Sequence, residues 1–419
     1  MQKSDSKTPW LWIPTLYFVE GIPYFIVNTI SLIMFKDMGM DNGTLALLTS
    51  LISIPWVVKP LWSPFVDIFR SKRWWIVTMQ FIMLAAIALV AGSVRLTTFT
   101  VTLILFIIAA FASATHDIAA DGFYMLALDE RRQSAFVGIR STFYRIAMVF
   151  GQGVLVVLAG VLEKRMGDIP AAWSVTMLVS AVLLLLLALY HAFILPRPAE
   201  DRSAATVRSA ADVAREFGAA FSSFFRKKGV WLAIAFMLLY RLPEAFSVKM
   251  LFPFFKDPVQ DGGLGLGTDT FGLVYGTFGV IALLAGGILG GLAAARSGLK
   301  RCIWPMALSL ALPCSVYLFM SIFQPSNIWV VGACVVLDQF GYGFGFSAYM
   351  LYMMHFSEGP LKTSHYAICT AFMALSMMLP GLVAGYLQEA LGYVGFFILV
   401  MLCCLATFFV TFFVRRRLP

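Results

Sequence analysis

Charged side chains are scarce in this sequence. Asp, Glu, Lys and Arg make up 13% of its 419 residues, whereas hydrophobic residues make up 60%. Soluble domains are closer to half apolar and a quarter charged, so this composition excludes an ordinary soluble protein. The mean hydropathy of +0.85 agrees. The sequence indicates a polytopic membrane protein.

Sequence signs of enzyme chemistry are also missing. No Gly-x-x-x-x-Gly-Lys-[Ser/Thr] loop occurs, and GGLGLG at 262–267 lacks the lysine, which argues against ATP-driven pumping. The six cysteines show no metal-type spacing, and none falls in a predicted outer loop where oxidation could pair it. We therefore predict no enzyme activity, no metal site and no cofactor.

Long apolar runs, by contrast, recur along the whole chain. A spanning helix needs ~20 predominantly apolar residues, and continuous runs favour helices over alternating strands. We predict an all-α membrane protein with twelve transmembrane helices, at residues 11–35, 44–66, 74–94, 98–125, 134–161, 172–195, 230–255, 269–295, 302–323, 328–354, 363–388 and 393–414.

The basic excess follows the predicted topology. The formal net charge is +9, and 21 of the 31 Lys and Arg residues fall in segments that are inner if the N-terminus is inner. This asymmetry is typical of a multi-pass membrane protein with both termini cytoplasmic. The charge therefore predicts contact with membrane lipid and no nucleic-acid partner.

One long polar segment divides six spans from six. We predict an N-terminal six-helix bundle at 1–195, a cytoplasmic linker at 196–229 and a C-terminal bundle at 230–419. The linker is either a helix on the inner membrane face or a plain connection. Weak internal matches, such as GFYML at 122–126 and SAYML at 347–351, indicate a duplication. Pseudo-symmetric bundles of this kind are typical of secondary transporters that alternate access to a midplane site, and we expect a monomer.

The stretch THDIAADGFYML at 115–126 places ionisable groups at membrane depth. Asp117 and Asp121 are four residues apart, so they share one helix face, with His116 beside them. Two close carboxylates are suited to exchanging a proton, so we predict that these three residues couple transport to protons. Arg140 and Arg145 of the next span could reach the pair and hold an anionic cargo; the alternative is a static salt bridge between the two spans.

Prolines mark a second place where charges enter the bilayer. Glu20 and Tyr24 flank Pro23 in the first span, while Arg241 and Glu244 flank the corresponding proline of the seventh. Unwound backbone at membrane depth is tolerated where it lines a cavity. We predict that these residues face a central cavity, Glu20 as a proton-coupling group and the others as substrate-binding groups, although Arg241 and Glu244 could simply neutralise each other.

The remaining charged residues within the predicted spans are weaker candidates for a functional role. Asp338 precedes the glycine-rich FGYGFGF, where close helix packing is the alternative to substrate binding. Lys59 and Lys249 could extend to a membrane interface. The sequence assigns no chemistry to three further histidines near span ends: His191, His355 and His365.

Several motifs resemble the AmpG family of muropeptide permeases in the major facilitator superfamily. The sequence KPLWSPFVD at 59–67 resembles that family's Lys-Phe-Leu-Trp-Ser-Pro-x-x-Asp, and SATHDIAAD at 113–121 resembles its Ser-x-Gln-Asp-Ile-x-x-Asp. Similarity extends to FYRIAM at 143–148 and LYRLPEAF at 239–246. Departures include the histidine at 116 and the glutamate at 20.

This resemblance implies the major facilitator fold and proton-driven import of anhydro-muropeptides across a bacterial inner membrane. By motif, the family's functional carboxylates correspond to Asp117 and Asp121, and its fifth-span arginine to Arg145. The aromatic residue beside it, Tyr144, suits a sugar face. Major facilitator proteins also carry a gating loop between spans 2 and 3, to which Asp67, Lys72 and Arg73 correspond.

The sequence therefore predicts a proton-coupled importer of a carboxylated amino-sugar, glycopeptide or muropeptide-like solute. Two alternatives keep the fold: import of another oligosaccharide, or proton-driven export of a siderophore- or drug-like compound. A membrane receptor without flux is a third.

Overall fold

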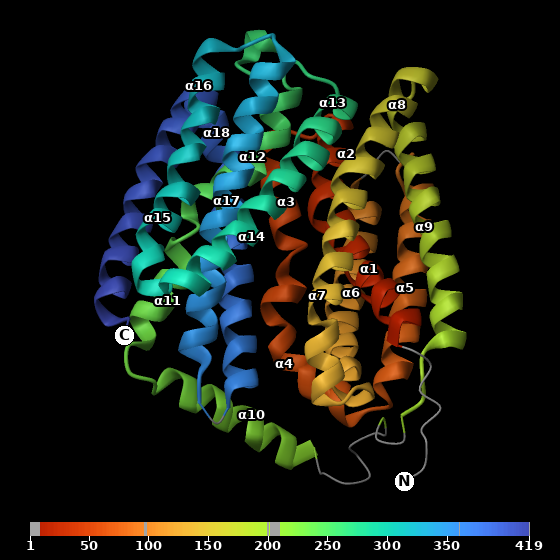
Figure 1. Ribbon diagram of the computed structural model, residues 1–419. Coiled ribbons are helices and arrows are strands. Elements are labelled where there is room, and N and C mark those ends of the chain that lie inside the picture. Colours follow the sequence, from red (N-terminus) through yellow and green to blue (C-terminus); the bar gives the residue numbers. More distant parts are fainter. Residues whose placement is uncertain (1–8, 96–98, 199–200, 202–209, 360, 419) are drawn as a thin grey trace. The chain divides into compact units, whose positions relative to one another are not determined.

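Helices account for nearly all of the chain (Figure 1). The computed structural model describes residues 9–95, 99–198, 201, 210–359 and 361–418, and no strand occurs within these ranges. The predicted all-α class is confirmed. The helices are α1 (Ile13–Phe25), α2 (Ser31–Asp37), α3 (Asn42–Leu51), α4 (Ile54–Ile68), α5 (Lys72–Ser93), α6 (Phe99–Ala127), α7 (Glu130–Met148), α8 (Val156–Met166), α9 (Ile169–Ile194), α10 (Ala210–Phe225), α11 (Val230–Leu239), α12 (Leu242–Lys256), α13 (Thr268–Leu273), α14 (Val280–Ser297), α15 (Leu299–Ala311), α16 (Ser315–Phe323), α17 (Ile328–Ser357) and α18 (Lys362–Arg417).

Eleven helical segments of the described residues are long and apolar enough to cross a membrane. The last of them, Ser364–Arg417, has 54 residues, more than twice the ~20 that one crossing needs. It is interrupted at Gly392, whose φ of 66° and ψ of 173° are not helical. Glycine reaches this conformation without a steric penalty. The break falls between the predicted eleventh and twelfth spans, and the number twelve stays a prediction.

Side-chain caps explain where several helices begin. Asp41, Ser71, Asp129 and Asp168 each precede a helix with extended backbone, and each side chain accepts a hydrogen bond from a backbone N–H of the first turn. These N–H groups have no partner within the helix, so a short polar side chain in front of an apolar run stabilises that start. The polar residues between the apolar runs thus determine where each span begins.

Contacts divide the chain into two compact units. Unit 1 contains residues 1–31 and 58–217, and unit 2 contains residues 32–57 and 218–419. In unit 1, α5 packs against α6 and α9, and α1 against α7; in unit 2, α17 packs between α14 and α15, and α18 against α12 and α11 (Figure 1). Residues 32–57 belong to the first predicted bundle by sequence, yet they pack with unit 2 because α3 lies along α18.

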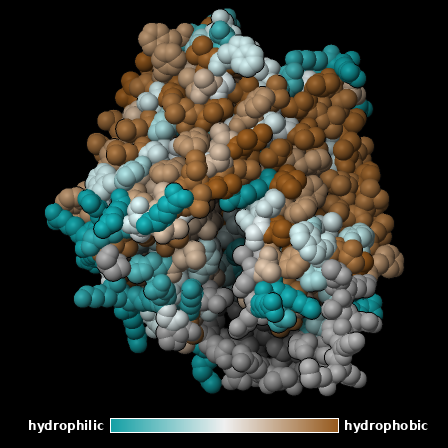
Figure 2. Space-filling model, viewed as in Figure 1, coloured by the Kyte–Doolittle hydropathy of each residue, from teal (hydrophilic) through white to brown (hydrophobic). Residues whose placement is uncertain are grey.

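The sides of the helices are apolar outward as well as inward. Trp329 is 82% exposed and Trp231 74% exposed, and many other large apolar side chains are also open. Figure 2 shows hydrophobic residues over the middle of the helices on the visible face, with hydrophilic residues gathered towards helix ends. Lipid tails solvate such a surface, whereas water would drive it to associate.

The predicted linker contains a helix. Within α10, Phe224 is fully buried and contacts the rings of Phe356, His365 and Phe372. Neighbouring Phe225 and Arg226 are exposed. One apolar face of this helix thus packs on unit 2. The side chains of Asp212, Val213, Glu216 and Phe217, which suggested the amphipathic pattern, lie outside the described part.

Candidate functional site

The centre of unit 1 holds an arginine bonded to a carboxylate of α6. Arg140 Nη2 of α7 donates to Asp121 Oδ1 at 2.7 Å, and the Tyr17 hydroxyl of α1 lies 3.3 Å from the same oxygen. The Arg140 guanidinium lies over the rings of Tyr17 and Tyr124, 4.4 and 5.2 Å from their centroids. Three helices therefore converge on one ion pair.

Both side chains of this ion pair are partly exposed. The Arg140 side chain is 29% exposed and that of Asp121 is 44% exposed. Water weakens the attraction between exposed charges, so this pair is held less firmly than an enclosed pair would be. The geometry can offer the guanidinium to a second carboxylate, since arginine has five N–H donors.

One helical turn earlier, Asp117 faces a different cation. Lys59 Nζ of α4 lies 3.9 Å from Asp117 Oδ2, with the two side chains 26% and 16% exposed. The sequence predicted one arginine near both aspartates; the structure places a separate base beside each. Arg145 forms no ion pair with any described residue, so its family-based role stays a prediction.

Glu20 adds a third carboxylate to unit 1. Its Oε2 atom is buried and has no hydrogen-bond partner among the described residues. A buried carboxylate oxygen without a partner is costly, so such a group usually serves a ligand or a proton. The close approach of α1 and α7 holds it there: a Cβ added to Gly21 would lie 2.7 Å from Ala147 Cβ and 3.2 Å from the Tyr144 carbonyl oxygen.

Aromatic rings accompany Glu20 along the same stretch. The rings of Tyr24 and Phe25 are 5.2 Å apart in an edge-to-face arrangement, and Phe25 lies 5.7 Å from Tyr144. The helix changes to a π-helical turn at Ile26–Ile30, directly after Pro23. Such turns are frequent at functional sites because they redirect side chains.

His116 faces away from both aspartates. It is fully buried, and its Nε2 lies 3.0 Å from Gln80 Nε2 of α5. Gln80 also contacts His191 Nδ1 at 3.1 Å, and His191 Nε2 lies 2.9 Å from Thr15 Oγ1. This chain joins α1, α5, α6 and α9 behind the site. The sequence assigned no chemistry to His191 and overlooked Gln80, whose one signal was a polar residue inside the apolar run VTMQFIML.

In unit 2, Arg241 and Glu244 bond to each other. Arg241 Nη2 lies 3.0 Å from Glu244 Oε2 and donates to the Tyr342 hydroxyl at 2.7 Å. The guanidinium lies 4.7 Å from the Phe346 ring centroid. Both charged side chains are nearly enclosed, at 6% and 11% exposed. The sequence had left two interpretations open, substrate binding and mutual neutralisation, and this geometry favours mutual neutralisation.

Asp338 is also satisfied within unit 2. Its Oδ2 accepts from the Tyr317 hydroxyl at 2.7 Å and from Gln339 Nε2 at 3.0 Å, and the residue is 6% exposed. The neighbouring glycines allow close packing, as Gly343 shows: an added Cβ would lie 2.0 Å from the Leu283 carbonyl oxygen. Packing and internal hydrogen bonds therefore account for Asp338 in this conformation.

The predicted gating loop begins α5. The backbone N–H groups of Lys72 and Arg73 donate to the two carboxylate oxygens of Asp201, at 2.6 and 3.0 Å. Arg73 Nε donates to the Leu195 carbonyl oxygen at 3.3 Å. A carboxylate of the linker thus binds the N-terminus of α5, where the helix dipole favours negative charge. The side chain of Asp67 lies outside the described part.

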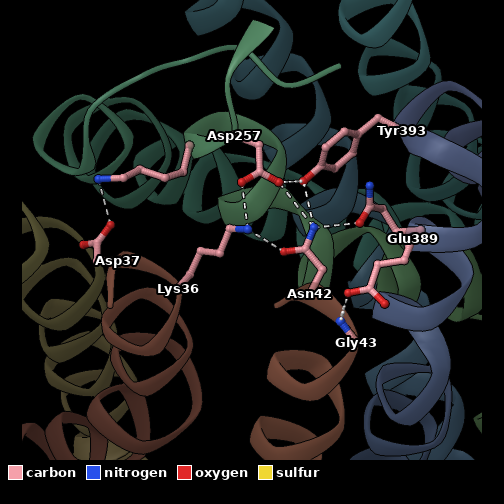
Figure 3. A network of polar contacts seen from close by, with 9 residues as sticks. Lys36, Asp37, Asn42, Gly43, Asp257, Glu389 and Tyr393 are labelled. Atoms are coloured by element: carbon pink, nitrogen blue, oxygen red, sulfur yellow. Dashed lines mark hydrogen bonds and ion pairs between the residues drawn. The ribbon is translucent and has the colours of Figure 1, made fainter. Parts of the chain in front are cut away.

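A network of polar contacts, which the sequence did not predict, surrounds the start of α3 in unit 2 (Figure 3). Lys36 Nζ lies 2.7 Å from both Asp257 Oδ1 and Asn42 Oδ1. Asn42 Nδ2 donates to Gln388 Oε1 at 2.6 Å, and the Tyr393 hydroxyl donates to Asp257 Oδ2 at 2.5 Å. The backbone N–H of Gly43 donates to Glu389 at 2.7 Å. We call these six side chains and the Gly43 amide the α3 network.

A second ion pair lies beside the α3 network. Lys256 Nζ is 2.9 Å from Asp37 Oδ1, whose side chain is fully enclosed, and the Thr268 hydroxyl donates to the same carboxylate at 2.9 Å (Figure 3). Residues far apart in the sequence thus meet within unit 2. A single sequence contains no pattern that pairs these positions.

Comparison with known proteins defines the class. The family model described as "Major Facilitator Superfamily" matches residues 15–360. The chain belongs to this superfamily and has its fold. It is a multi-pass membrane transporter rather than an enzyme.

Within the superfamily the chain is AmpG-like. It is 25% identical to the anhydromuropeptide permease of Escherichia coli (strain K12), over 91% of this chain and 75% of that protein. It is 22% identical to putative transporter AmpG 4 of Rickettsia conorii, over 96% and 95%. The predicted family resemblance is confirmed.

Solved structures support the fold alone. The nucleoside transporter NupG matches with a TM-score of 0.70 and 16% identity, over 97% of this chain and 98% of that chain. A D-xylose-proton symporter matches with a TM-score of 0.70 and 12% identity, over 95% and 96%.

Proposed function

We propose that this protein is a proton-coupled symporter that imports an anionic amino-sugar or muropeptide-like solute across a bacterial inner membrane by alternating access. The observation that carries the proposal is the partly exposed pair of Arg140 and Asp121 at the convergence of α1, α6 and α7. The relatives named above supply the solute class, because one of them is an anhydromuropeptide permease.

The chemistry of the pair suits exchange between a proton and an anion. While Asp121 is ionised, it occupies Arg140 through a 2.7 Å charge-assisted hydrogen bond. Protonation of Asp121 removes that charge and leaves the guanidinium for a carboxylate of the cargo. Arg140 can bind such a carboxylate through two parallel N–H donors. Proton and cargo therefore bind together and leave together.

Neighbouring groups suit the rest of such a cargo. The rings of Tyr17 and Tyr124 already contact the guanidinium, and Tyr24 lies one turn after Glu20 on α1. Aromatic faces pack well against the apolar faces of sugar rings. The buried Glu20 oxygen can accept a hydrogen bond from a sugar hydroxyl or hold a second proton.

Transport in proteoliposomes tests the proposal. We expect labelled anhydromuropeptide to accumulate only under an inward proton gradient. Asp121→Asn removes the proton-binding group while keeping the shape, so it should abolish accumulation but spare exchange of labelled for unlabelled cargo.

Asp129→Asn is the matched control, because Asp129 is an exposed helix cap and asparagine caps equally well. Accumulation by Asp121→Asn at the control level would remove Asp121 from coupling. Gradient-driven loss of cargo from loaded vesicles would replace import by export, and uptake of neutral oligosaccharides instead would change the cargo.

A further inference from the structure

A lysine in the middle of α12 is buried. Lys249 is 7% exposed, so its side chain is enclosed among helices of unit 2 in this conformation. The sequence had left open that this side chain extends to a membrane interface. The Nζ atom has one hydrogen bond among the described residues, a 3.4 Å contact to Thr49 Oγ1 of α3. An ammonium has three N–H donors, so most of its bonding capacity is unused.

The pocket around Lys249 is formed by three helices of unit 2. A Cβ added to Gly381 of α18 would lie 2.9 Å from Lys249 Cε and 2.3 Å from Ser50 Oγ. Thr49 and Ser50 are fully buried, and Ser50 Oγ has no hydrogen-bond partner within the described part of the chain. The lysine is thus enclosed where α3, α12 and α18 meet, beside a second polar group without a partner.

No carboxylate among the described residues compensates this lysine. Helix α3 contains no acidic or basic residue within its bounds. On α12, Glu244 pairs with Arg241 at 3.0 Å and Lys256 pairs with Asp37 at 2.9 Å. On α18, Glu389 accepts from the Gly43 amide at 2.7 Å, and His365 is bonded to Ser223. The carboxylates within all three helices thus have other partners, and the remaining basic residues of α18, Lys362 and Arg415 to Arg417, lie at its two ends.

An uncompensated ammonium is costly at membrane depth, whereas the neutral amine costs far less. We propose that Lys249 is a second protonation site of the transport cycle, which loses its proton when α3 closes onto α12 and α18 and regains one when they separate. On closing, an N–H bond of the ammonium breaks, the electron pair stays on Nζ, and the proton leaves to water. On opening, water returns the proton to the amine.

This inference rests on the proposed alternating-access function in one respect. Helix α3 belongs to the first half of the duplicated sequence, so its separation from α12 and α18 is a movement between halves. Closure then depends on proton concentration, independently of the Arg140 site. Lys249 would link the closing of α3 to the proton gradient.

The experiment follows the opening of α3 without any cargo. Ser50 is replaced by cysteine in a variant whose six natural cysteines are replaced by serine, and the protein is reconstituted in liposomes. A water-soluble thiol reagent reaches the new cysteine only when α3 separates from α18. Rates are measured from pH 5 to 9 and divided by the rate for the unfolded protein, which cancels the ionisation of the thiol itself.

With Lys249 present, the normalised rate should rise as pH falls, by up to about tenfold per pH unit where the lysine titrates. In Lys249→Met, which keeps the length but not the charge, labelling should be slow and nearly independent of pH. Equal pH profiles with and without Lys249 would overturn the proposal.

A second measurement needs no substitution at all. Nitrogen-15 NMR of the lysine side chains distinguishes an ammonium from a neutral amine by chemical shift, and it needs no reagent to enter the closed contact. The Lys249 signal should change from ammonium to amine as the pH rises and α3 closes, whereas the signal of Lys164, which is exposed in the last turn of α8, should not follow this closure. A Lys249 that stays protonated throughout would equally reject the site. Both readouts are independent of cargo, so failure of Asp121→Asn to uncouple import would reject the proposed function and leave this result standing.

Discussion

Replacing Gly385 by alanine inserts a methyl group into the contact between α18 and α3. The added Cβ would lie 1.8 Å from the Asn42 carbonyl oxygen, 2.4 Å from its carbonyl carbon and 2.8 Å from Gly43 Cα. All three neighbours are backbone atoms, so no side-chain rotation relieves the clash. Helix α3 must move away from α18 by more than 1 Å, since carbon contacts are comfortable only at ~3.5 Å or more.

This displacement has a cost that can be estimated from the contacts broken. The Asn42–Gln388 bond of 2.6 Å and the Gly43–Glu389 bond of 2.7 Å both cross the contact. A neutral hydrogen bond contributes ~0.5–1.5 kcal/mol and one to a charged group ~1.5–3, so the closed arrangement should lose about 2–4 kcal/mol. That corresponds to roughly a 30- to 1,000-fold shift towards open α3.

The Ser50→Cys labelling assay measures this shift directly. Gly385→Ala should raise the normalised labelling rate, and it should also reduce import, because the open arrangement would persist through the cycle. Gly332→Ala is the matched control: it is a helical glycine of α17 with open space around its Cβ position. Alanine there should be neutral or slightly stabilising. Unchanged labelling and import in Gly385→Ala would refute the inference that the α3 network holds α3 closed against α18.

Two stability predictions follow from other contacts. Arg241→Met leaves Glu244 buried beside an apolar side chain, so the free energy of unfolding should fall by about 3–5 kcal/mol in thermal unfolding. Replacing Glu244 by methionine as well should largely restore it. Equal losses in the single and double variants would contradict mutual neutralisation. The hydrogen bond from the Thr44 N–H lowers the pKa of Asp41. This cap therefore stabilises α3 fully at pH values above the ordinary aspartate pKa, and the stabilisation is lost as the pH falls through the lowered pKa. Asp41→Ala should therefore destabilise the protein by about 0.5–2 kcal/mol at pH 7 but have little effect near pH 2. Asp41→Asn, whose amide does not titrate, should resemble the parent at pH 7 and be more stable than the parent near pH 2, as calorimetric unfolding would show.

Local sequence patterns were sufficient for the architecture. Long apolar runs predict membrane-spanning helices because hydrocarbon cannot satisfy backbone hydrogen bonds, and this requirement acts on each segment separately. The pair Asp117 and Asp121 could likewise be placed on one face from their spacing alone. The motifs around Lys59, Asp121 and Glu244 were enough to recognise the AmpG-like family.

Partners of the charged groups depended on contacts between distant segments. The sequence could not show that Arg140 takes Asp121 while Lys59 takes Asp117, nor that His116 turns to Gln80, because neighbouring residues on a helix point about 100° apart and only packing decides what each direction meets. Nothing in the sequence around Asp201 predicted that this linker residue would bind the start of α5.

Sequence by itself therefore determined the class of protein, its helical segments and the face of α6 that carries the acids, since each follows from interactions within one segment or with the lipid around it. Only the tertiary structure decided which base each acid meets, that residues 32–57 pack within unit 2, and that Lys249 is enclosed without a carboxylate of the described residues beside it. Those features arise where helices remote in the chain come within a few ångströms of one another, and side-chain electrostatics at membrane depth depend on that distance.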